Sequence, residues 1–333
     1  MCFEVILVHF WQGTVSLCLI PFDALKGFSV PVFMFVSFYF TEKTLNGGGL
    51  CLRKVNAEIS LISGRVKGRI LRIIYPQLGW AIIYWIVYIV LQFKLGMNIG
   101  FDDLLWQIFT GHRLNPPMWF LTVLIALTLV FFIAFSFIDG RKRLIFVFAV
   151  SLFSFWVQYS GYNVIWFGNL RFELKYPLGR FFEMIPYASL GYIVAYFDIF
   201  NSLKKKRVVF VCLFGILSLI LLKYKNLIPP APGFSYSNNI YLIRVFFLVG
   251  FAYLLPFEGI SEKSKQIVRH IVKFTLGVYC MHWLVGLMLN VLFAGIGMKI
   301  DSFILCVLIY ICSYSISFIM CMFSSKYFKL LVE

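Results

Sequence analysis

The sequence predicts an all-α integral membrane protein, a polytopic helical bundle with about ten transmembrane helices and no separate soluble domain. Hydrophobic residues make up 61% of the 333 residues and charged residues only 13%, whereas a soluble domain carries roughly 25% charged residues. The mean hydropathy is +0.89. Aromatic residues reach 20% and suit lipid-facing surfaces and interfacial belts. A compact soluble enzyme would need far more polar surface than this chain has.

Apolar runs separated by short polar segments mark the expected helices. Several approach the roughly 20 residues that a helix needs to cross a bilayer. The second run is short and the fifth is marginal. No segment has the composition of a linker, so we expect one transmembrane domain over 1–333. The ten expected spans are 3–21, 28–41, 73–93, 118–138, 144–160, 181–198, 208–223, 239–257, 273–293 and 302–324.

The distribution of basic residues predicts the orientation. One alternating set of segments holds 20 of the 30 lysines and arginines, and the opposite set holds nine. Basic residues concentrate on the cytoplasmic side of membrane proteins, so both termini are expected to be cytoplasmic. The basic clusters would also contact anionic lipid headgroups. The net charge of +16 is thus explained by topology, and no nucleic-acid partner is expected. The cytoplasmic loops are expected at 42–68, 139–143, 201–207 and 258–272.

Motifs for several common chemistries are absent from the sequence. The eight cysteines form no C-x-x-C pair, which speaks against a disulfide framework and a redox motif. No metal-ligand spacing occurs, so no metal is expected. There is also no phosphate-binding glycine loop and no G-x-S-x-G nucleophile motif.

Two histidines lie deep in expected spans, where a polar residue is costly and is a functional candidate by default. His9 is followed on the same helix face by Gln12, Gly13 and Ser16. That face should line the bundle interior or a wet cavity. A catalytic histidine and a packing histidine explain this pattern equally well. For His282, in the ninth span, packing is the favoured interpretation.

Arginines are the remaining candidates. Arg69 and Arg72 share one helix face before the third span and would grip phosphates bidentately, although membrane anchoring by basic residues is favoured from spacing alone. Arg180 and Glu183 are spaced as an ion pair at the outer interface. Arg244 lies inside the eighth span, where it would snorkel outward or point at an acceptor; a functional role is slightly favoured.

Taken together, these stretches resemble membrane-bound acyltransferase family 3, which includes O-acetyltransferases of bacterial surface polysaccharides. The matching stretches are ILVHF, VPVFMFVSFYF, RILRIIYPQLGW, MWFL and GVYCMHW, in the family's order from the first residues to about position 285. The family usually has a basic residue upstream of this histidine, beyond the start of the chain, so we expect a misassigned start or a truncation. The family's S-G-[YF] pattern corresponds here to Ser37 followed by Phe38.

The resemblance implies an inner-membrane enzyme that transfers an acetyl or other short acyl group from acyl-CoA to a hydroxyl of a surface or lipid-linked polysaccharide. It implies that His9 is catalytic and that Arg69 and Arg72 contact coenzyme A. His9 would act as a general base or carry the acyl group covalently, and the sequence does not distinguish the two. Arg244, Arg180, Glu183 and His282 are candidates for acceptor-side or supporting roles.

Two other functions fit the helix count and the basic clusters. The main alternative is a transporter or flippase of a lipid-linked sugar or another amphiphile, although the chain lacks repeated halves and paired broken helices. A polysaccharide polymerase is the third, for which a larger outer loop would be expected.

Overall fold

The structure of the protein is a computed structural model, which describes residues 2–11, 16–17, 20–21, 27–46, 55–95, 99–138, 141–159, 164–167, 170–173, 178–223, 239–255, 260–323 and 331. The chain divides into two compact units, and each is considered by itself. Unit 1 comprises residues 1–15, 69–122 and 257–333, and unit 2 comprises residues 16–68 and 123–256. The prediction of a single domain over 1–333 is untested by this division and stays a prediction.

Each of the ten expected spans coincides with a helix over most or part of its length. Within the described residues, five helical segments are long and apolar enough to cross a membrane: Lys67–Gln92, Pro116–Phe137, Arg141–Tyr159, Thr275–Gly295 and Ser302–Met322. The count of ten spans stays a prediction. The matching helices are α1 (Cys2–Phe10), α2 (Ser29–Asn46), α3 (Val55–Leu95), α5 (Trp119–Phe137), α6 (Arg141–Tyr159), α7 (Leu178–Tyr196), α9 (Arg207–Lys223), α10 (Asn239–Leu254), α12 (Thr275–Gly295) and α13 (Ser302–Phe323).

The first span is corrected by the structure. Helix α1 ends at Phe10, and the two-residue strands β1 (Ser16–Leu17) and β2 (Ile20–Pro21) pair antiparallel within the expected helix 3–21. The polar face proposed for Gln12, Gly13 and Ser16 falls on side chains outside the described residues. A second hairpin, β3 (Val164–Phe167) with β4 (Leu170–Glu173), pairs Val164 with Glu173. The fold is therefore predominantly helical, with two small hairpins that the sequence did not indicate.

Short elements fill the connections between the long helices. They are the helices α4 (Phe101–Thr110), α8 (Ile199–Leu203) and α11 (Glu262–Lys273), and the 3-10 turns η2 (Pro116–Met118) and η3 (Lys204–Lys206). Helices α4 and α11 lie in segments that we expected to be loops on opposite sides of the membrane.

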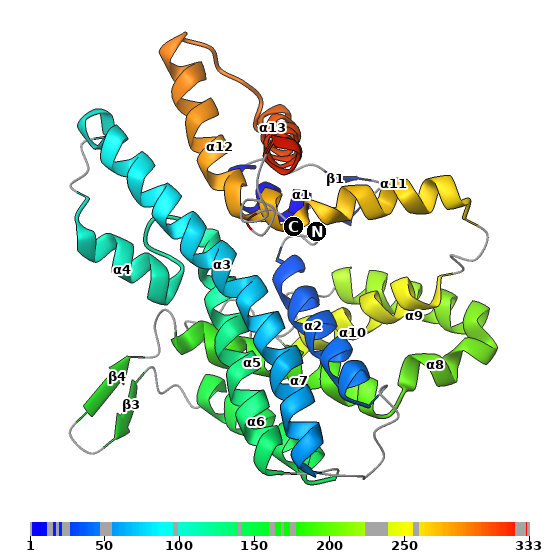
Figure 1. Cartoon of the computed structure of the whole chain (residues 1–333). Coiled ribbons are helices and arrows are strands. Elements are labelled where there is room, and N and C mark those ends of the chain that lie inside the picture. Colours follow the sequence, from blue (N-terminus) through cyan, green and yellow to red (C-terminus); the bar gives the residue numbers. More distant parts are fainter. Residues whose placement is uncertain are drawn as a thin grey trace. The chain divides into compact units, whose positions relative to one another are not determined.

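Unit 2 is organised around the packing of α2 on α7 (Figure 1). A Cβ atom at Gly191 would lie 2.1 Å from the backbone oxygen of Phe35, so only glycine permits this close approach of two backbones. Pro186 interrupts α7 and cannot donate to the carbonyl of Phe182 four residues earlier. Ser154 and Gln158 of α6 donate to that carbonyl instead, at 2.6 and 3.0 Å. The break in α7 is therefore satisfied by its neighbour.

Unit 1 packs the short helix α1 against α12 and α13 (Figure 1). The Phe3 ring meets the rings of Phe303 and Tyr310 edge-on, with centroids 6.2 and 5.7 Å away. A Cβ atom at Gly286 would lie 2.2 Å from the Phe10 ring. The absence of a side chain at Gly286 thus lets the end of α1 approach the middle of α12.

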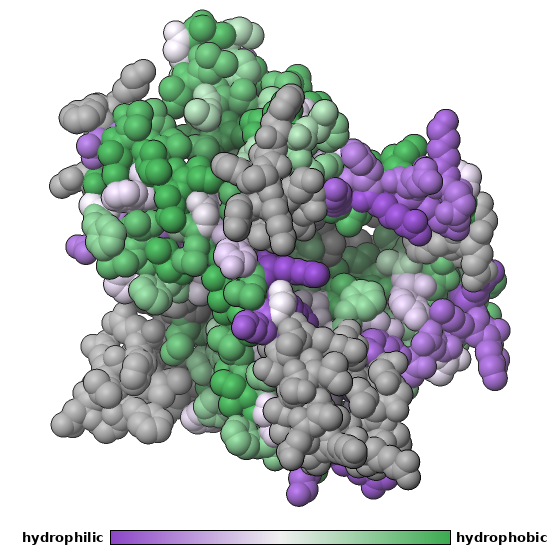
Figure 2. Space-filling view, in the orientation of Figure 1, coloured by the Kyte–Doolittle hydropathy of each residue, from purple (hydrophilic) through white to green (hydrophobic). Residues whose placement is uncertain are grey.

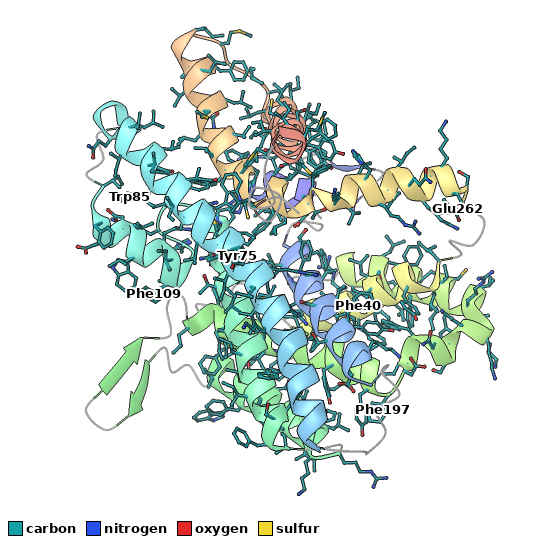
Figure 3. The ribbon with its side chains drawn as sticks, in the orientation of Figure 1. Phe40, Tyr75, Trp85, Phe109, Phe197 and Glu262 are labelled. Carbon is teal, nitrogen blue, oxygen red and sulfur yellow. The ribbon has the colours of Figure 1, made fainter. Side chains whose placement is uncertain are left out.

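Large apolar side chains face outward in both units, as expected where lipid rather than water is the solvent. Phe40, Tyr75 and Phe109 expose 58%, 47% and 70% of their surface (Figure 3). Hydrophobic residues also dominate the visible faces of the long helices in the space-filling view (Figure 2).

Candidate active site

The two histidines singled out in the sequence lie side by side in unit 1. His9 stands in the last turn of α1, and its ring centroid is 5.8 Å from that of His282 on α12. The Trp283 ring meets His9 edge-on at 5.6 Å, and Phe10 packs on Trp283 at 5.5 Å. The His9 side chain is exposed, whereas His282 is completely buried. The close packing of α1 at Gly286 thus places the accessible imidazole of His9 next to the buried imidazole of His282.

The hydrogen bonding of His282 determines which of its nitrogens is available. The Nδ1 atom lies 2.6 Å from the carbonyl oxygen of Tyr279. Because a carbonyl only accepts hydrogen bonds, Nδ1 carries the proton and the neutral ring presents Nε2 as an acceptor. Nε2 is buried and has no hydrogen-bond partner within the described residues. His282 therefore offers a free lone pair in the protein interior.

The turn of α12 that carries His282 is held from two other segments. The Tyr84 hydroxyl of α3 donates to the Cys280 carbonyl at 2.9 Å and accepts from the Leu284 amide at 3.0 Å. In a regular α-helix those two backbone groups bond to each other. The Asn115 side chain also donates to the Cys280 carbonyl, at 2.9 Å. Tyr84 thus contacts α12 on both sides of His282, at the residue two positions before it and at the residue two positions after it.

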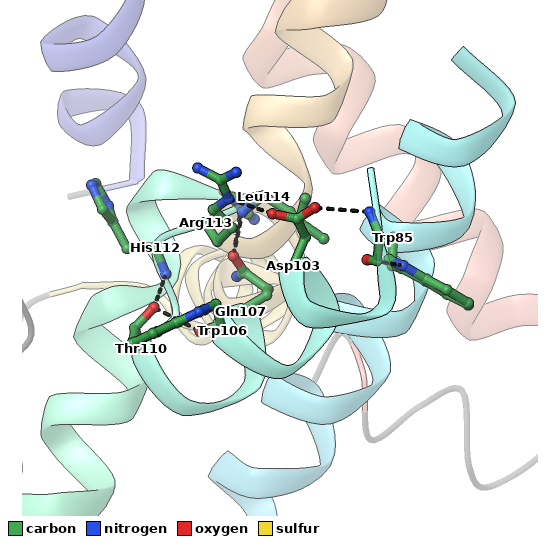
Figure 4. Close-up of polar contacts among 10 residues, drawn as sticks. Trp85, Asp103, Trp106, Gln107, Thr110, His112, Arg113 and Leu114 are labelled. Carbon is green, nitrogen blue, oxygen red and sulfur yellow. Dashed lines mark hydrogen bonds and ion pairs between the residues drawn. The ribbon is translucent and has the colours of Figure 1, made fainter. Parts of the chain in front are cut away.

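Tyr279 and Gln107 attach the loop before α5 to this site. The Tyr279 hydroxyl donates to the Pro117 carbonyl in η2. Gln107 of α4 accepts from the backbone amides of Leu114 and Asn115, at 2.6 and 3.0 Å (Figure 4). Asn115 is fully buried, and its side-chain oxygen has no hydrogen-bond partner within the described residues. The loop between α4 and α5 is therefore shaped by buried polar side chains, one of which presents a second unused acceptor.

An ion pair closes the far end of this loop. Arg113 donates to the Asp103 carboxylate at 2.5 Å, and the Gly100 amide donates to its other oxygen at 2.9 Å (Figure 4). The Arg113 hydrogen bond, followed by that of Gly100, holds the pKa of Asp103 below its usual value. The carboxylate therefore stays charged and keeps α4 fixed to the loop.

The two candidate coenzyme A arginines lie on α3 in the same unit. Arg69 is half-buried and Arg72 is exposed. Arg72 precedes Tyr84 by twelve positions, about 18 Å along a helix axis. Pro76 lies between them and cannot donate to the Arg72 carbonyl. One helix thus carries both basic side chains and the hydroxyl that holds the His282 turn.

The remaining candidates lie in unit 2. Arg180 and Glu183 form an ion pair at 2.5 Å, one turn apart on α7, and the Glu183 side chain is only 1% exposed. Arg244 is also 1% exposed, and its guanidinium carbon lies 4.1 Å from the centroid of the Phe28 ring. A guanidinium in this position makes a cation–π contact inside the unit and does not reach outward. These three residues occur in a different unit from the histidine pair.

Tyr84, Asn115 and Gln107 are the site residues that sequence reasoning missed. Asn115 precedes two prolines just before the MWFL stretch, and Tyr84 is one of many aromatic residues in the third span. Neither has a distinctive spacing. Among the described residues, no group of three or more histidines, cysteines and acidic residues is placed to hold a metal ion; that no metal takes part stays a prediction.

The helices define a helical membrane protein, and in unit 1 an exposed imidazole lies beside a buried one in an arrangement suited to proton transfer. A family model described as an acyltransferase domain, acyltransferase family 3, matches residues 1–322. The chain therefore belongs to this family and is a membrane acyltransferase, as the sequence stretches around His9 and His282 predicted. No curated protein and no solved structure matches the chain.

Proposed function

We propose that this acyltransferase moves an acetyl or other short acyl group from acyl-CoA to a hydroxyl of a surface or lipid-linked polysaccharide. The observation that carries the proposal is the pairing of His9 with His282 in the unit that also contains Arg69 and Arg72. A sugar hydroxyl is a weak nucleophile, so a group with a pKa near neutral must take its proton as it attacks. Histidine suits that step.

Arg69 and Arg72 contact the phosphates of the acyl donor in this proposal. Guanidinium groups bind phosphates bidentately, and both arginines are on the expected cytoplasmic side. The separation of about 18 Å between Arg72 and Tyr84 along α3 requires a long, flexible donor. Coenzyme A fits this requirement because its pantetheine arm separates the phosphates from the thioester.

The proposed location is the bacterial inner membrane, with both termini in the cytoplasm. This orientation rests on the distribution of basic residues. A transporter or flippase explains the helices and basic clusters as well, but it gives no reason for a buried histidine with an unused nitrogen beside an accessible one.

Coenzyme A binding by the purified chain tests this function. Isothermal titration in lipid nanodiscs should show saturable binding of acetyl-CoA, with coenzyme A as a competitor and dephospho-coenzyme A weaker if phosphate contacts matter. The acetylated product should then be sought on the surface polysaccharide of cells that express the chain. No detectable binding of either nucleotide would return the transporter function to first place.

A further inference from the structure

The groups around His282 fix its orientation in the way that neighbouring groups fix a catalytic general base. In enzymes with an activated nucleophile, the base lies beside the nucleophile and a third group fixes its orientation. Here the Tyr279 carbonyl holds Nδ1 of His282, and His9 is the neighbouring side chain. Within the described residues Nε2 has no hydrogen-bond partner, and it is buried with the rest of the ring. A histidine that only packs would not need a turn of its helix fixed by both Tyr84 and Asn115.

His9 differs from His282 in accessibility. Its side chain is exposed, at the end of a short helix, and its ring is tilted by 33° relative to the His282 ring. The exposed His9 ring is accessible to a thioester substrate. The buried His282 ring, whose tautomer is fixed, is placed to receive a proton. The distance of 5.8 Å between the ring centroids makes the two rings neighbours, and no direct hydrogen bond joins them in the part of the chain that the structure describes.

We propose that the two histidines divide the reaction, with His9 as the acyl carrier and His282 as the base that activates the acceptor. In the first step, a His9 nitrogen forms a bond to the thioester carbon, the carbon–sulfur bond breaks, and the ring N–H proton goes to the thiolate. In the second step, the acceptor oxygen bonds to the acyl carbon and the carbon–nitrogen bond breaks. The hydroxyl proton moves to Nε2 of His282 and then passes to the His9 ring, which becomes neutral imidazole again.

This inference rests on the proposed function and selects one of its two mechanisms. Each step balances without an added oxidant, reductant or metal.

Rapid-quench measurement of coenzyme A release from acetyl-CoA tests the division, with water as the hydroxyl probe. The wild type should release a burst of one coenzyme A per site, followed by slow turnover. His282→Asn keeps a donor to the Tyr279 carbonyl but removes Nε2, so the burst should remain and the steady rate should fall a hundredfold or more. Acid-quenched protein should then hold labelled acetyl on His9. His9→Ala should abolish the burst.

His282→Gln is the matched control, because its amide accepts a hydrogen bond near the Nε2 position but takes up no proton. It should be as slow as His282→Asn. Wild-type turnover in either His282 variant, or equal loss of the burst and the steady rate in a variant with wild-type thermal stability, would overturn the division. Failure of the wild type to bind coenzyme A would refute the proposed function instead, so the two failures are distinguishable.

Helix α11 carries a second, independent inference. Its apolar residues Ile267, Val268, Ile271 and Val272 are 44–60% exposed and cover an arc of about 140° at 3.6 residues per turn. The visible part of this helix is largely hydrophilic (Figure 2). Its charged residues are mostly basic, with Lys263, Lys265, Arg269 and Lys273 against the single acidic residue Glu262. Helix α12, a candidate span, begins two residues after α11 ends.

The geometry points to the anionic headgroup layer of the membrane as the partner of α11. A helix joined to the start of a span lies at the level of the headgroups, and a basic amphipathic helix binds there by burying its apolar arc while its lysines meet lipid phosphates. By the helical angles, Lys263 and Lys265 stand at the two borders of the arc, where long basic side chains reach from apolar to polar surroundings.

Fluorescent labelling of single added cysteines tests this partner in nanodiscs. The NBD label at Val268→Cys should become brighter and blue-shifted when phosphatidylglycerol is added to phosphatidylcholine, and salt should weaken the change. The matched label at Gln266→Cys, on the polar face, should change little; unsubstituted protein gives the background from native cysteines. Equal responses at both sites would overturn the inference. Shielding at Val268→Cys that depends on protein concentration in detergent would assign the arc to a second copy of the chain and would equally overturn it.

Discussion

Each unit contains a helix whose backbone groups form hydrogen bonds with side chains of a neighbouring helix, but for different reasons. In unit 2, Pro186 removes a hydrogen bond from α7, and Ser154 and Gln158 supply the missing donors to the Phe182 carbonyl. In unit 1, α12 contains no proline, yet the Tyr84 hydroxyl donates to the Cys280 carbonyl and accepts from the Leu284 amide. In unit 2 the side chains supply the donors that a proline lacks, whereas in unit 1 the Tyr84 hydroxyl bonds to backbone groups of a helix that contains no proline. The difference indicates that unit 2 is built for packing and that the turn around His282 is built for position.

The largest effect that would sharpen this contrast is expected at His9. His9→Ala should abolish measurable transfer, because the acyl carrier is lost and no other exposed imidazole adjoins His282 in the described residues of unit 1. Acetylation is measured in a strain without the native gene, with membrane levels of the protein checked. His270→Ala, on α11, is the matched control and should retain activity. Normal acetylation by His9→Ala would remove the catalytic role from unit 1.

A smaller loss is expected at the arginines of α3. Arg69→Ala and Arg72→Ala should each weaken coenzyme A binding roughly tenfold to a hundredfold, since a charge-assisted hydrogen bond contributes about 1.5–3 kcal/mol. Lysine at either position should rescue only in part because it lacks the planar fork. Titration calorimetry measures the affinities. Lys67→Ala, at an exposed position two residues before Arg69 on the same helix, should bind normally. An unchanged affinity in the double arginine variant would leave Arg69 and Arg72 with anchoring alone.

The helices α7 and α12 should respond differently to the loss of these side chains. Tyr84→Phe removes a donor and an acceptor from α12, and Gln158→Leu removes one of two donors to the Phe182 carbonyl. Each should lower the free energy of unfolding by about 0.5–1.5 kcal/mol, the net contribution of a typical hydrogen bond. Only Tyr84→Phe should also slow transfer. Thermal unfolding and acetylation are measured together, and an equal loss of activity in both variants would contradict the contrast between the units.

The smallest effect concerns pH and compares Asp103 of unit 1 with Asp198 of unit 2. Hydrogen bonds from Arg113 and from Lys43, respectively, lower the pKa of each carboxyl group. A lowered pKa stabilises the fold above the unfolded-state pKa of about 4, and this stabilisation is lost as the pH falls through the folded-state pKa. At neutral pH, Asp103→Asn should cost about 1–2 kcal/mol. Asp198→Asn should cost at most about 1 kcal/mol because that ion pair is exposed.

Thermal unfolding in detergent, followed from neutral pH to below about pH 4, checks this difference. The unfolding curves of each variant and the wild type should converge at the acidic end, where both carboxylates are protonated. A difference that persists there would mean that the side chain acts through packing and not through its charge.

Sequence reasoning predicted the long helices because apolar runs of sufficient length have few other uses. It predicted the extent of the first helix incorrectly. Helix α1 ends at Phe10, before the polar and small residues that a helical period had placed on one face. The hairpins were missed because strands of two to four residues carry too little alternation to be read from polar segments.

The site was predicted in part, and for a physical reason. A histidine inside an apolar run is costly enough to be noticed, so His9 and His282 were both singled out. Their proximity depends on the packing of α1 at Gly286, which no spacing in one sequence reveals. Tyr84 and Asn115 act on backbone groups of α12, and such contacts leave no pattern in the side chains.

The position of the Tyr84 hydroxyl also couples two distant parts of the chain mechanically. Because it bridges Cys280 and Leu284, the twist between the halves of α12 depends on where α3 stands. Arg69 and Arg72 lie toward the other end of α3, beyond the weak point at Pro76. An acyl donor that displaces those arginines would move α3, and the Tyr84 hydroxyl would pass this movement to the turn of α12 that carries His282. The orientation of His282 would then change although the donor does not contact it. The Tyr84 hydroxyl would then influence when His282 is oriented for the reaction, and not only how tightly the donor binds.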